Sequence, residues 1–359
     1  MKVRFSTSVL ALTLVAVLAL GVSGVGSAAP AVSPTTNATA DTAAATFKVA
    51  LVTDIGGLDD RSFNFLANKG LQDAKRKLGI QGRVFISRSN GDYIPNLRAA
   101  VQQYRANLVI AVGFLMADSL STVAKAFPKT KFAIVDNTGV AAELKGKPTN
   151  VRGLLFKEQE AGYLAGYLAA LAMKKQPRGQ GKLGAVGGMK IPPVDRFIAG
   201  YYVGAKKAWP QVRVSHSYSQ EFVDQAKCKE QALNLIANGA GVVFQVAGQC
   251  GLGVLSAARE KGMWGIGVDA DQGYLGPHVL TSATKKVDVA VYNSISAAKT
   301  QGSRFKTNFN AVFTVKNNGV GYGKISTRIL PAWKKELESI RLQIVSGKIK
   351  VTAQTPPGG

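Results

Sequence analysis

Short apolar runs alternate with longer amphipathic stretches along the chain from residue 48 onward. The apolar runs are rich in β-branched residues, which favours strands buried on both faces of a parallel sheet. The amphipathic stretches carry apolar residues at helical spacing. This alternation predicts an α/β fold, with a first series of elements at 48–52, 83–87, 96–105, 108–111, 118–127, 132–135, 151–156 and 158–175.

A second series of the same kind follows the first, which predicts a second α/β lobe. Each lobe is expected to be a mostly parallel sheet flanked by helices. The second series lies at 182–186, 194–209, 213–217, 224–238, 241–245, 253–261 and 265–268, and later elements at 279–282, 286–300, 311–315 and 331–346.

The first 29 residues have the pattern of a secretory signal peptide. Lys2 and Arg4 precede an apolar run that ends in small residues, and glycines interrupt the run before it reaches the ~20 residues that span a bilayer. Residues 30–46, rich in Ala, Thr, Ser and Pro, predict a flexible tether, and 351–359 a short tail. An uncleaved anchor is the alternative to signal cleavage.

The composition is that of a globular protein, with 46% hydrophobic and 18% charged residues in 359. Its formal net charge of +24 invites a nucleic-acid interpretation. Lys and Arg are spread along the whole chain, however, which is typical of a solvated surface. We therefore expect no nucleic-acid partner.

The loop after the first predicted strand is the first candidate for ligand binding. Its sequence, Asp-Ile-Gly-Gly-Leu-Asp-Asp-Arg-Ser-Phe-Asn from Asp54 to Asn64, predicts a tight turn and a helix capped by Ser62. Ligands of parallel sheets bind beyond the carboxyl ends of the strands. Asp54, Phe63 and Asn64 suit a flat ligand with polar edges. The alternative is structural: a loop cap, a core ring and a helix cap.

Several later loops also begin where a predicted strand ends, and they supply acids, a second aromatic, a glycine-rich turn and a lysine. Parallel strands end at one edge of a sheet, so these loops are expected to face the same cleft. The candidates that they add are Asp136, Phe222, Gly248, Asp269 and Lys285. Lys285 has a structural alternative, which is to neutralise Asp269.

The order of these motifs resembles the basic membrane protein family of ABC-transporter substrate-binding lipoproteins, which includes purine nucleoside receptors. The resemblance covers about residues 47–344. It is carried by the stretch from Asp54 to Asn64, by Tyr-Leu-Ala-Gly at 163–166, by Gly-Gly at 187–188 and by Gly-Val-Asp-x-Asp-Gln at 267–272. It implies a two-lobed type I periplasmic-binding-protein fold with a ligand cleft between the lobes.

The resemblance also implies how the chain divides between the lobes. In that fold the late elements cross back, so lobe 1 is expected to hold 47–155 and about 279–305. Lobe 2 is expected to hold 156–278 and about 306–350. The connection between the lobes would then be a hinge of several strands, and a ligand would be trapped by hinge closure.

The residue roles implied by the resemblance are those of a nucleoside site. Phe63 and Phe222 match the two aromatics that sandwich a purine, and stacking tolerates either purine. The groups that read the base edge match Asp54, Asn64 and Asp136. The ribose-side group matches Gly248, Asp269 and Lys285.

The chain has two cysteines, Cys228 and Cys250, and an even count in an exported protein favours a disulfide. The family usually has glycine and threonine at these places. The bridge would stiffen one wall of the cleft, and two free buried cysteines are the alternative. With only two histidines, neither spaced with a cysteine, we expect no metal site and no cofactor.

An enzyme remains the distant alternative. The acids from Asp54 to Asp60 also resemble the calcium-binding cluster of nucleoside hydrolases, but that pattern needs an aspartate where this chain has Val52. Few general bases are available with two histidines. The resemblance instead implies a non-catalytic protein.

The function that follows is capture of a nucleoside, most simply a purine nucleoside, for an ABC importer. The expected partners are the nucleoside and a membrane permease, and the protein is expected to be an exported monomer. A sugar or a small signal molecule is the alternative ligand, since fold does not decide function. No cysteine lies at the expected cleavage region, which argues against the lipid anchor that is typical of the family.

Overall fold

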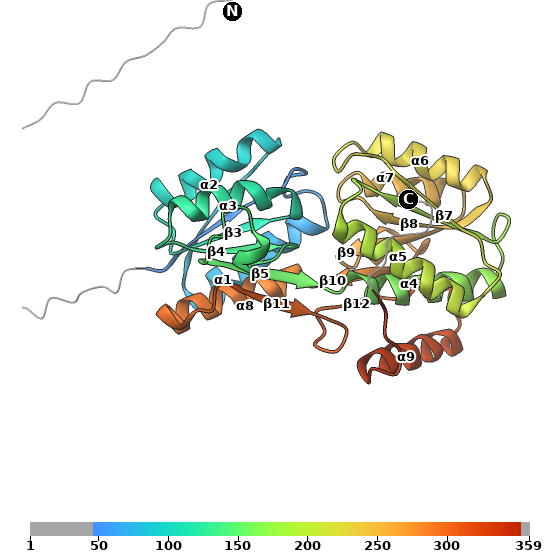
Figure 1. The fold of residues 1–359 in the computed structure, drawn as a ribbon. Coiled ribbons are helices and arrows are strands. Elements are labelled where there is room, and N and C mark those ends of the chain that lie inside the picture. The colour runs from blue at the N-terminus through green and yellow to red at the C-terminus, as the bar shows by residue number, and fades with distance from the viewer. Residues whose placement is uncertain (1–45, 353–359) are drawn as a thin grey trace, which may run out of the picture. The chain divides into compact units, whose positions relative to one another are not determined.

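The computed structural model describes residues 46–352, so the expected signal peptide and most of the tether and tail lie outside the described residues. Two six-stranded sheets organise this part of the chain (Figure 1). Each sheet has helices on both faces, as the alternating pattern predicted. Within 46–352 no helix has the length and apolar character needed to cross a bilayer.

The first sheet is entirely parallel and has the order β11-β5-β4-β3-β1-β2. Helices α1 (Phe63–Leu78) and α8 (Val287–Gln301) cover one face, and α2 (Tyr93–Gln102) and α3 (Ala117–Ala126) cover the other. Its strands are β1 (Lys48–Val52), β2 (Gln81–Phe85), β3 (Leu108–Val112), β4 (Lys131–Val135), β5 (Val151–Phe156) and β11 (Phe309–Phe313). We call this sheet and its helices lobe 1.

The second sheet has the order β12-β10-β9-β8-β6-β7, and only β12 runs antiparallel to its neighbour. Helices α4 (Glu158–Lys175) and α5 (Pro192–Ala208) cover one face, and α6 (Gln225–Ala237) and α7 (Gly251–Glu260) cover the other. Its strands are β6 (Lys182–Gly187), β7 (Val214–Tyr218), β8 (Ala240–Val246), β9 (Trp264–Asp269), β10 (Val279–Lys285) and β12 (Val320–Tyr322). This is lobe 2, and α9 (Pro331–Val345) packs on its helix α4.

The lobe assignment expected for two late strands was wrong. Strand β10 pairs with β9 in lobe 2, whereas residues from 279 onward were expected in lobe 1. Strand β11 pairs with β5 in lobe 1, whereas residues from 306 onward were expected in lobe 2. Both sheets offer an apolar edge, so the apolar runs by themselves do not specify which sheet a late strand joins.

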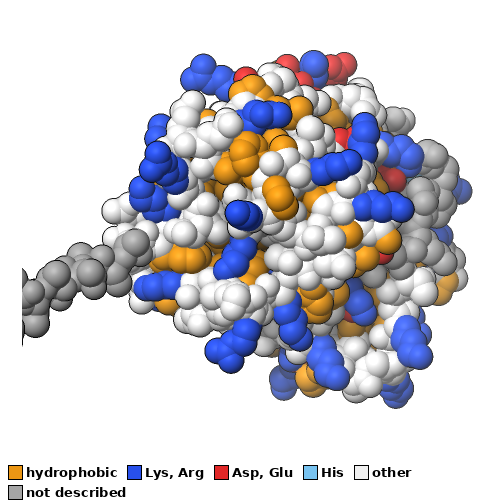
Figure 2. Space-filling view, turned by 60° about the vertical axis from the view of Figure 1, so that its left-hand side comes forward, with side chains coloured by type: hydrophobic (Ala, Val, Ile, Leu, Met, Phe, Trp, Pro, Cys, Tyr) orange, Lys and Arg blue, Asp and Glu red, His pale blue; other side chains and the backbone are white. Residues whose placement is uncertain are grey.

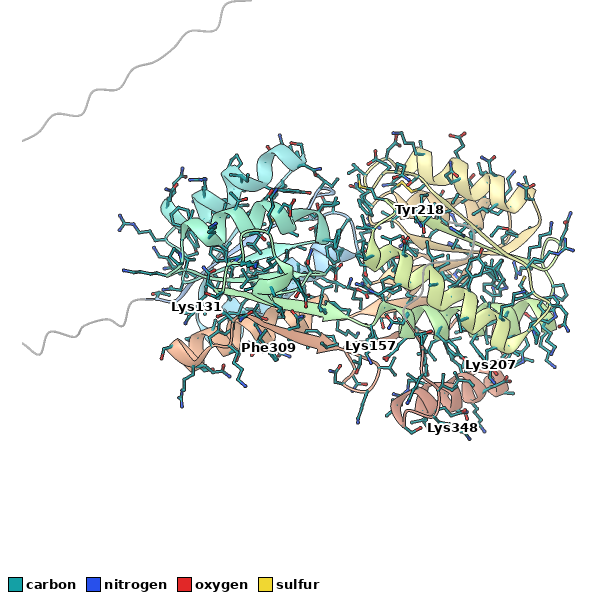
Figure 3. The ribbon with its side chains drawn as sticks, in the orientation of Figure 1. Lys131, Lys157, Lys207, Tyr218, Phe309 and Lys348 are labelled. Carbon is teal, nitrogen blue, oxygen red and sulfur yellow. A yellow bond between two sulfur atoms is a disulfide. The ribbon has the colours of Figure 1, made fainter. Side chains whose placement is uncertain are left out.

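The chain passes between the lobes three times, at Lys157, at Lys286 and at 314–319. Backbone bonds tie these crossings together. The Lys157 amide donates to the Phe313 carbonyl at 2.9 Å, and the Lys286 amide donates to the Gly319 carbonyl at 2.8 Å. The lobes are thus joined by three short segments, which agrees with the expected hinge of several strands. Figure 3 labels Lys157 at one of the crossings.

Helices α4 and α5 approach each other through glycines, which places the start of α5 beside the second sheet. A Cβ atom at Gly166 would lie 2.0 Å from the Tyr201 carbonyl oxygen, and one at Gly204 would lie 2.0 Å from the Tyr163 carbonyl oxygen. Neither approach is possible with a larger residue. The close packing holds the N-terminal turn of α5 where it can line the cleft.

Basic side chains are distributed over the surface. Figure 2 shows Lys and Arg scattered across one face with few acids among them. Lys207 and Lys348, labelled in Figure 3, are exposed and point away from the lobe 2 sheet. The acids treated below are instead buried.

Candidate ligand-binding site

One cavity lies between the carboxyl ends of the two sheets. It contains about 620 Å³ of space free of protein atoms, including its opening to solvent. The structure brings together all eight ligand-binding residues expected from the sequence, because each of them lines this cavity: Asp54, Phe63, Asn64, Asp136, Phe222, Gly248, Asp269 and Lys285. Their binding roles stay a prediction, and their geometry is described below.

Asp54 follows β1 and presents one carboxylate oxygen to the cavity. Its Oδ1 accepts the Ile55 amide at 2.8 Å and the Tyr93 hydroxyl. Its Oδ2 lies against Gly113, which has φ +111° and where a Cβ atom would be 2.2 Å from that oxygen. Burial raises the pKa of Asp54 to about 6, although the Tyr93 hydrogen bond opposes the shift.

Asn64 holds the loop that carries Asp54. Its Oδ1 accepts the Asp54 amide at 3.1 Å, and its Nδ2 donates to the Ile55 carbonyl at 3.3 Å. These two hydrogen bonds support a structural role for Asn64. Asn64 also lines the cavity, so the same side chain can hold the loop and face a ligand.

The helix cap expected at Ser62 is supplied by Asp60 instead. The Asp60 carboxylate accepts backbone N–H groups from Ser62 at 3.0 Å, Asn64 at 2.7 Å and Phe65 at 2.9 Å, while the Ser62 hydroxyl makes no cap bond. An acid two residues earlier reaches the free amides of α1, so the cap prediction was wrong by two positions. The hydroxyl of Ser62 is turned toward lobe 2.

The two aromatic rings come from opposite lobes. Phe63 begins α1 in lobe 1, and Phe222 lies in the loop between β7 and α6 of lobe 2. The Phe222 ring packs over Gly188, where a Cβ atom would lie 2.3 Å from its Cε1. The Phe222 carbonyl accepts the Cys250 amide at 3.0 Å. The backbone around Phe222 is thereby attached to the glycine-rich loop.

Lys285 is fully buried at the floor of the cavity, where it forms a charge cluster with acids of both lobes. Its Nζ lies 2.6 and 2.7 Å from the two oxygens of Asp136 and 3.1 Å from Glu158, which also accepts from Arg196 at 2.7 Å. Burial by itself lowers the pKa of Lys285, but Asp136, Glu158 and Asp269 outweigh that effect, so its pKa is raised. The closest partners of Lys285 are therefore Asp136 and Glu158 rather than Asp269.

Asp136 and Asp269 occupy the same position in the two lobes. Each lies at the end of the third strand in its sheet order, after β4 and at the end of β9, and each has positive φ, +70° and +59°. The Asp269 Oδ2 accepts the Ser62 hydroxyl at 2.8 Å. Burial raises the pKa of Asp269 to about 7, while Lys285 and Ser62 oppose the shift.

Gly248 lines the cavity on the lobe 2 side, and a disulfide follows it closely in the chain. Cys228 and Cys250 are bonded to each other with a Cα–Cα distance of 5.5 Å, which confirms the expected bridge. It joins α6 to the residue that precedes α7. Gly248, with φ +56°, lies two residues before Cys250 and faces the Phe222 carbonyl.

Four residues of the site were missed in the sequence. Phe197 in α5 lines the cavity. The other three support lining residues: Tyr93 donates to Asp54, and Glu158, paired with Arg196, contacts Lys285. Glu158 has a signal that could have been used, because it is an acid just after a buried strand, as Asp136 is. Tyr93 and Arg196 sit in ordinary amphipathic stretches, and no local pattern marks them.

The arrangement combines acceptors, one buried cation and two aromatic faces in a partly closed space. Within residues 46–352 no cluster of three or more His, Cys, Asp or Glu side chains is arranged to hold a metal ion. The aspartates of the first loop have different roles: Asp54 and Asp60 both line the cavity, but Asp60 uses both carboxylate oxygens to accept the amides at the start of α1. The site is suited to binding a flat polar molecule.

Comparisons with known proteins agree with this geometry. Residues 47–355 match the Bmp family, described as "ABC transporter substrate-binding protein PnrA-like". The chain is 35% identical to the ABC transporter nucleoside-binding protein BmpA of Lactococcus lactis, over 86% of this chain and 89% of that protein. It is 34% identical to an uncharacterized lipoprotein of Pyrococcus abyssi, over 77% of this chain and 68% of that protein.

Among solved structures, an ABC transporter solute-binding protein from Aeropyrum pernix superposes with a TM-score of 0.75 at 27% identity. The match covers 86% of this chain and 94% of that one. It confirms the two-lobed fold of periplasmic solute-binding proteins, each lobe a mostly parallel sheet flanked by helices. The Lactococcus and Aeropyrum proteins are named as binding proteins, and substrate-binding proteins of this kind act outside the cytoplasm. The chain belongs to the Bmp family of PnrA-like ABC transporter substrate-binding proteins.

Proposed function

We propose that this protein captures a purine nucleoside between its lobes and delivers it to the permease of an ABC importer. The observation that carries the proposal is a single cavity with one aromatic ring from each lobe, Phe63 and Phe222, and buried carboxylates from both lobes. Neither sheet by itself forms this cavity. A ligand that fills it therefore contacts both lobes and favours the closed state.

The base is placed between the rings. Stacking on an aromatic face contributes about 1–3 kcal/mol per base. Asp54 Oδ2 accepts an N–H of the base edge, and Asn64, which lines the cavity beside it, holds the Asp54 loop in place. Asp136 is held on Lys285 by both oxygens, so it meets the ligand as part of an ion pair.

The ribose is placed toward Asp269, Lys285 and Gly248. A carboxylate accepts two hydroxyl groups at once, and Lys285 donates to a ring or hydroxyl oxygen. Closure removes water from around these groups, which strengthens each polar contact. We propose further that the protein is an exported monomer that performs no reaction and does not bind nucleic acid.

The test is isothermal titration of the chain from residue 31 onward against purine and pyrimidine nucleosides, free bases, ribose and other sugars. The matched variants are Phe63→Ala and Phe65→Ala, two phenylalanines of one helix. Phe63 lines the cavity, whereas Phe65 is 45% exposed and does not. We expect Phe63→Ala to weaken purine nucleoside binding by about 5- to 150-fold, the equivalent of one stacking face, and Phe65→Ala to leave it unchanged.

Three outcomes would contradict parts of this proposal. If a sugar binds and no nucleoside does, the cavity belongs to a sugar-binding protein of the same fold. If nucleosides bind and are converted to base and ribose, the protein is an enzyme. Equal losses in the two phenylalanine variants would exclude stacking on Phe63.

A further inference from the structure

Ser62 is a buried side chain of lobe 1 whose hydroxyl bonds to lobe 2. It has no solvent exposure, and its Oγ lies 2.8 Å from Asp269 Oδ2 and 3.3 Å from the Val268 carbonyl. Its position at the start of α1 suggests a helix cap, but Asp60 already accepts the amides of that turn. The Ser62 hydroxyl is therefore available for the contact between the lobes.

The contact fixes one oxygen of Asp269 and leaves the other for a ligand. Oδ2 accepts from Ser62, and Oδ1 has no partner among the described residues, while Asp269 lines the cavity. The Ser62 hydroxyl can hydrogen-bond to Asp269 whether that carboxyl group is ionised or protonated. It donates to the ionised carboxylate, or it accepts from the protonated acid and donates to the Val268 carbonyl.

A second bond between the lobes has the same construction. Lys285 of lobe 2 is held by Asp136 of lobe 1, with Nζ–O distances of 2.6 and 2.7 Å. Asp269 and Lys285, the two charged groups on the ribose side, are thus each oriented by a residue of the opposite lobe. When the lobes separate, both groups lose that support.

We propose that Ser62 is a positioning residue for ligand capture, which orients the Asp269 carboxylate toward the ligand only when the lobes are closed. The proposal rests on the proposed function, in which Asp269 binds the ribose. Closure then has two effects. It encloses the ligand, and it brings Ser62 to the Asp269 carboxylate that binds the ligand.

The test compares Ser62→Ala with Ser121→Ala in the chain from residue 31 onward, which retains both sheets and every described contact. Ser121 is a matched control because it is a buried lobe 1 serine whose hydroxyl has no partner. Inosine is the probe. Loss of a hydrogen bond to a charged group predicts about 10-fold weaker binding for Ser62→Ala, no change for Ser121→Ala, and recovery in Ser62→Thr.

The pH profile separates positioning from a general structural role. The charged groups that face Asp269 are Lys285 of β10, Asp136 after β4 and Asp60 of the first loop, and all three remain in the variant. Without the Ser62 bond the Asp269 carboxylate is harder to ionise. The acidic fall in inosine affinity therefore shifts to higher pH by about one unit.

A measurement without ligand tests the role of Ser62 independently of whether the ligand is a nucleoside. Carboxyl ¹³C NMR of the free protein follows the ionisation of Asp269 directly, and Ser62→Ala is expected to raise that midpoint. If no nucleoside binds but the midpoint moves, the proposed ligand is wrong and the Ser62 contact stands. An unchanged midpoint, or an affinity loss of the same size at every pH, overturns the positioning role. Thermal unfolding of Ser62→Ala and Ser62→Thr establishes that both variants are folded.

Discussion

The two lobes share a sheet order, yet they present different chemistry to the ligand. Strand by strand, β11-β5-β4-β3-β1-β2 corresponds to β12-β10-β9-β8-β6-β7, and the third strand of each ends in an aspartate with positive φ. The end of β1 carries Asp54, whereas the end of the corresponding β6 carries Gly187 and Gly188. Lobe 1 places a carboxylate there, and lobe 2 leaves room for the Phe222 ring.

The helices that follow these strands continue the difference. The first turn of α1 is surrounded by polar groups, Asp60, Ser62 and Asn64, whereas α5 begins with Ile191, Pro193, Val194 and Phe197 against the cavity. Lobe 2 also has the disulfide beside its wall. One fold thus supplies polar recognition on one side and an apolar wall beside a disulfide on the other, because the residues at the strand ends and helix starts differ between the lobes.

The largest expected effect comes from breaking the charge cluster where the lobes meet. Lys285→Met leaves Asp136 buried without a cation and Glu158 with Arg196 alone, which costs about 3–5 kcal/mol of unfolding free energy. Lys286→Met, one residue later on an exposed side chain, is the control and is expected to be neutral. Urea unfolding of both variants measures the difference. Similar stabilities would mean that Lys285 is not required to neutralise these acids.

A smaller effect is expected from filling the two glycine positions at the strand ends. Gly113→Ala strains a backbone with φ +111° and pushes on Asp54, while Gly188→Ala pushes the Phe222 ring out of place. We expect Gly113→Ala to lower both stability and affinity, with a backbone cost of about 1–3 kcal/mol. Gly188→Ala is expected to lower mainly the affinity, by about 10-fold.

The control for both is Gly91→Ala, where an added Cβ atom would be 3.5 Å from its nearest neighbour. Thermal unfolding and nucleoside titration are measured for the three variants. Equal affinity in Gly188→Ala and Gly91→Ala would show that the position of the Phe222 ring does not matter for binding.

The smallest expected effect is a pH dependence that differs between the lobes. Burial raises the pKa of Asp54 to about 6 and that of Asp269 to about 7. The ionised form of each carboxyl group is the stronger acceptor of hydrogen bonds from the ligand. Affinity is therefore expected to be highest at alkaline pH and to fall as the pH drops through about 7 and then about 6.

The same shifts act on stability with the opposite sign. The folded pKa of each acid lies above its unfolded value, so the folded state binds more protons between them, and this contribution to stability is lost as the pH rises through the folded pKa. The two pH dependences are measured on wild type and Asp269→Asn from about pH 5 to about pH 9. Nucleoside titration measures the affinity, and urea unfolding measures the stability. An affinity independent of pH would show that neither carboxylate meets the ligand in ionised form.

Local sequence was enough to predict two α/β lobes and eight of the twenty residues that line the cavity. Apolar runs mark strands, and the residues just after them in a parallel sheet must face the ligand edge, which is how Asp54, Asp136 and Asp269 were identified. The disulfide followed from an even cysteine count together with the expectation of export.

Contacts between distant segments were beyond local patterns. Tyr93 reaches Asp54, Ser62 reaches Asp269, and Arg196 reaches Glu158, each pair separated by at least 38 positions. The lobe to which β10 and β11 belong was also not predictable, because an apolar strand fits either sheet edge.

What the sequence by itself determined is therefore the set of elements and the side chains at their ends, since periodicity and strand polarity act over a few residues. Only the tertiary structure decided which of those side chains bond to one another. A hydroxyl or carboxylate pairs with whatever donor or acceptor packing brings within about 3 Å, and for Ser62 and Lys285 that partner lies in the opposite lobe.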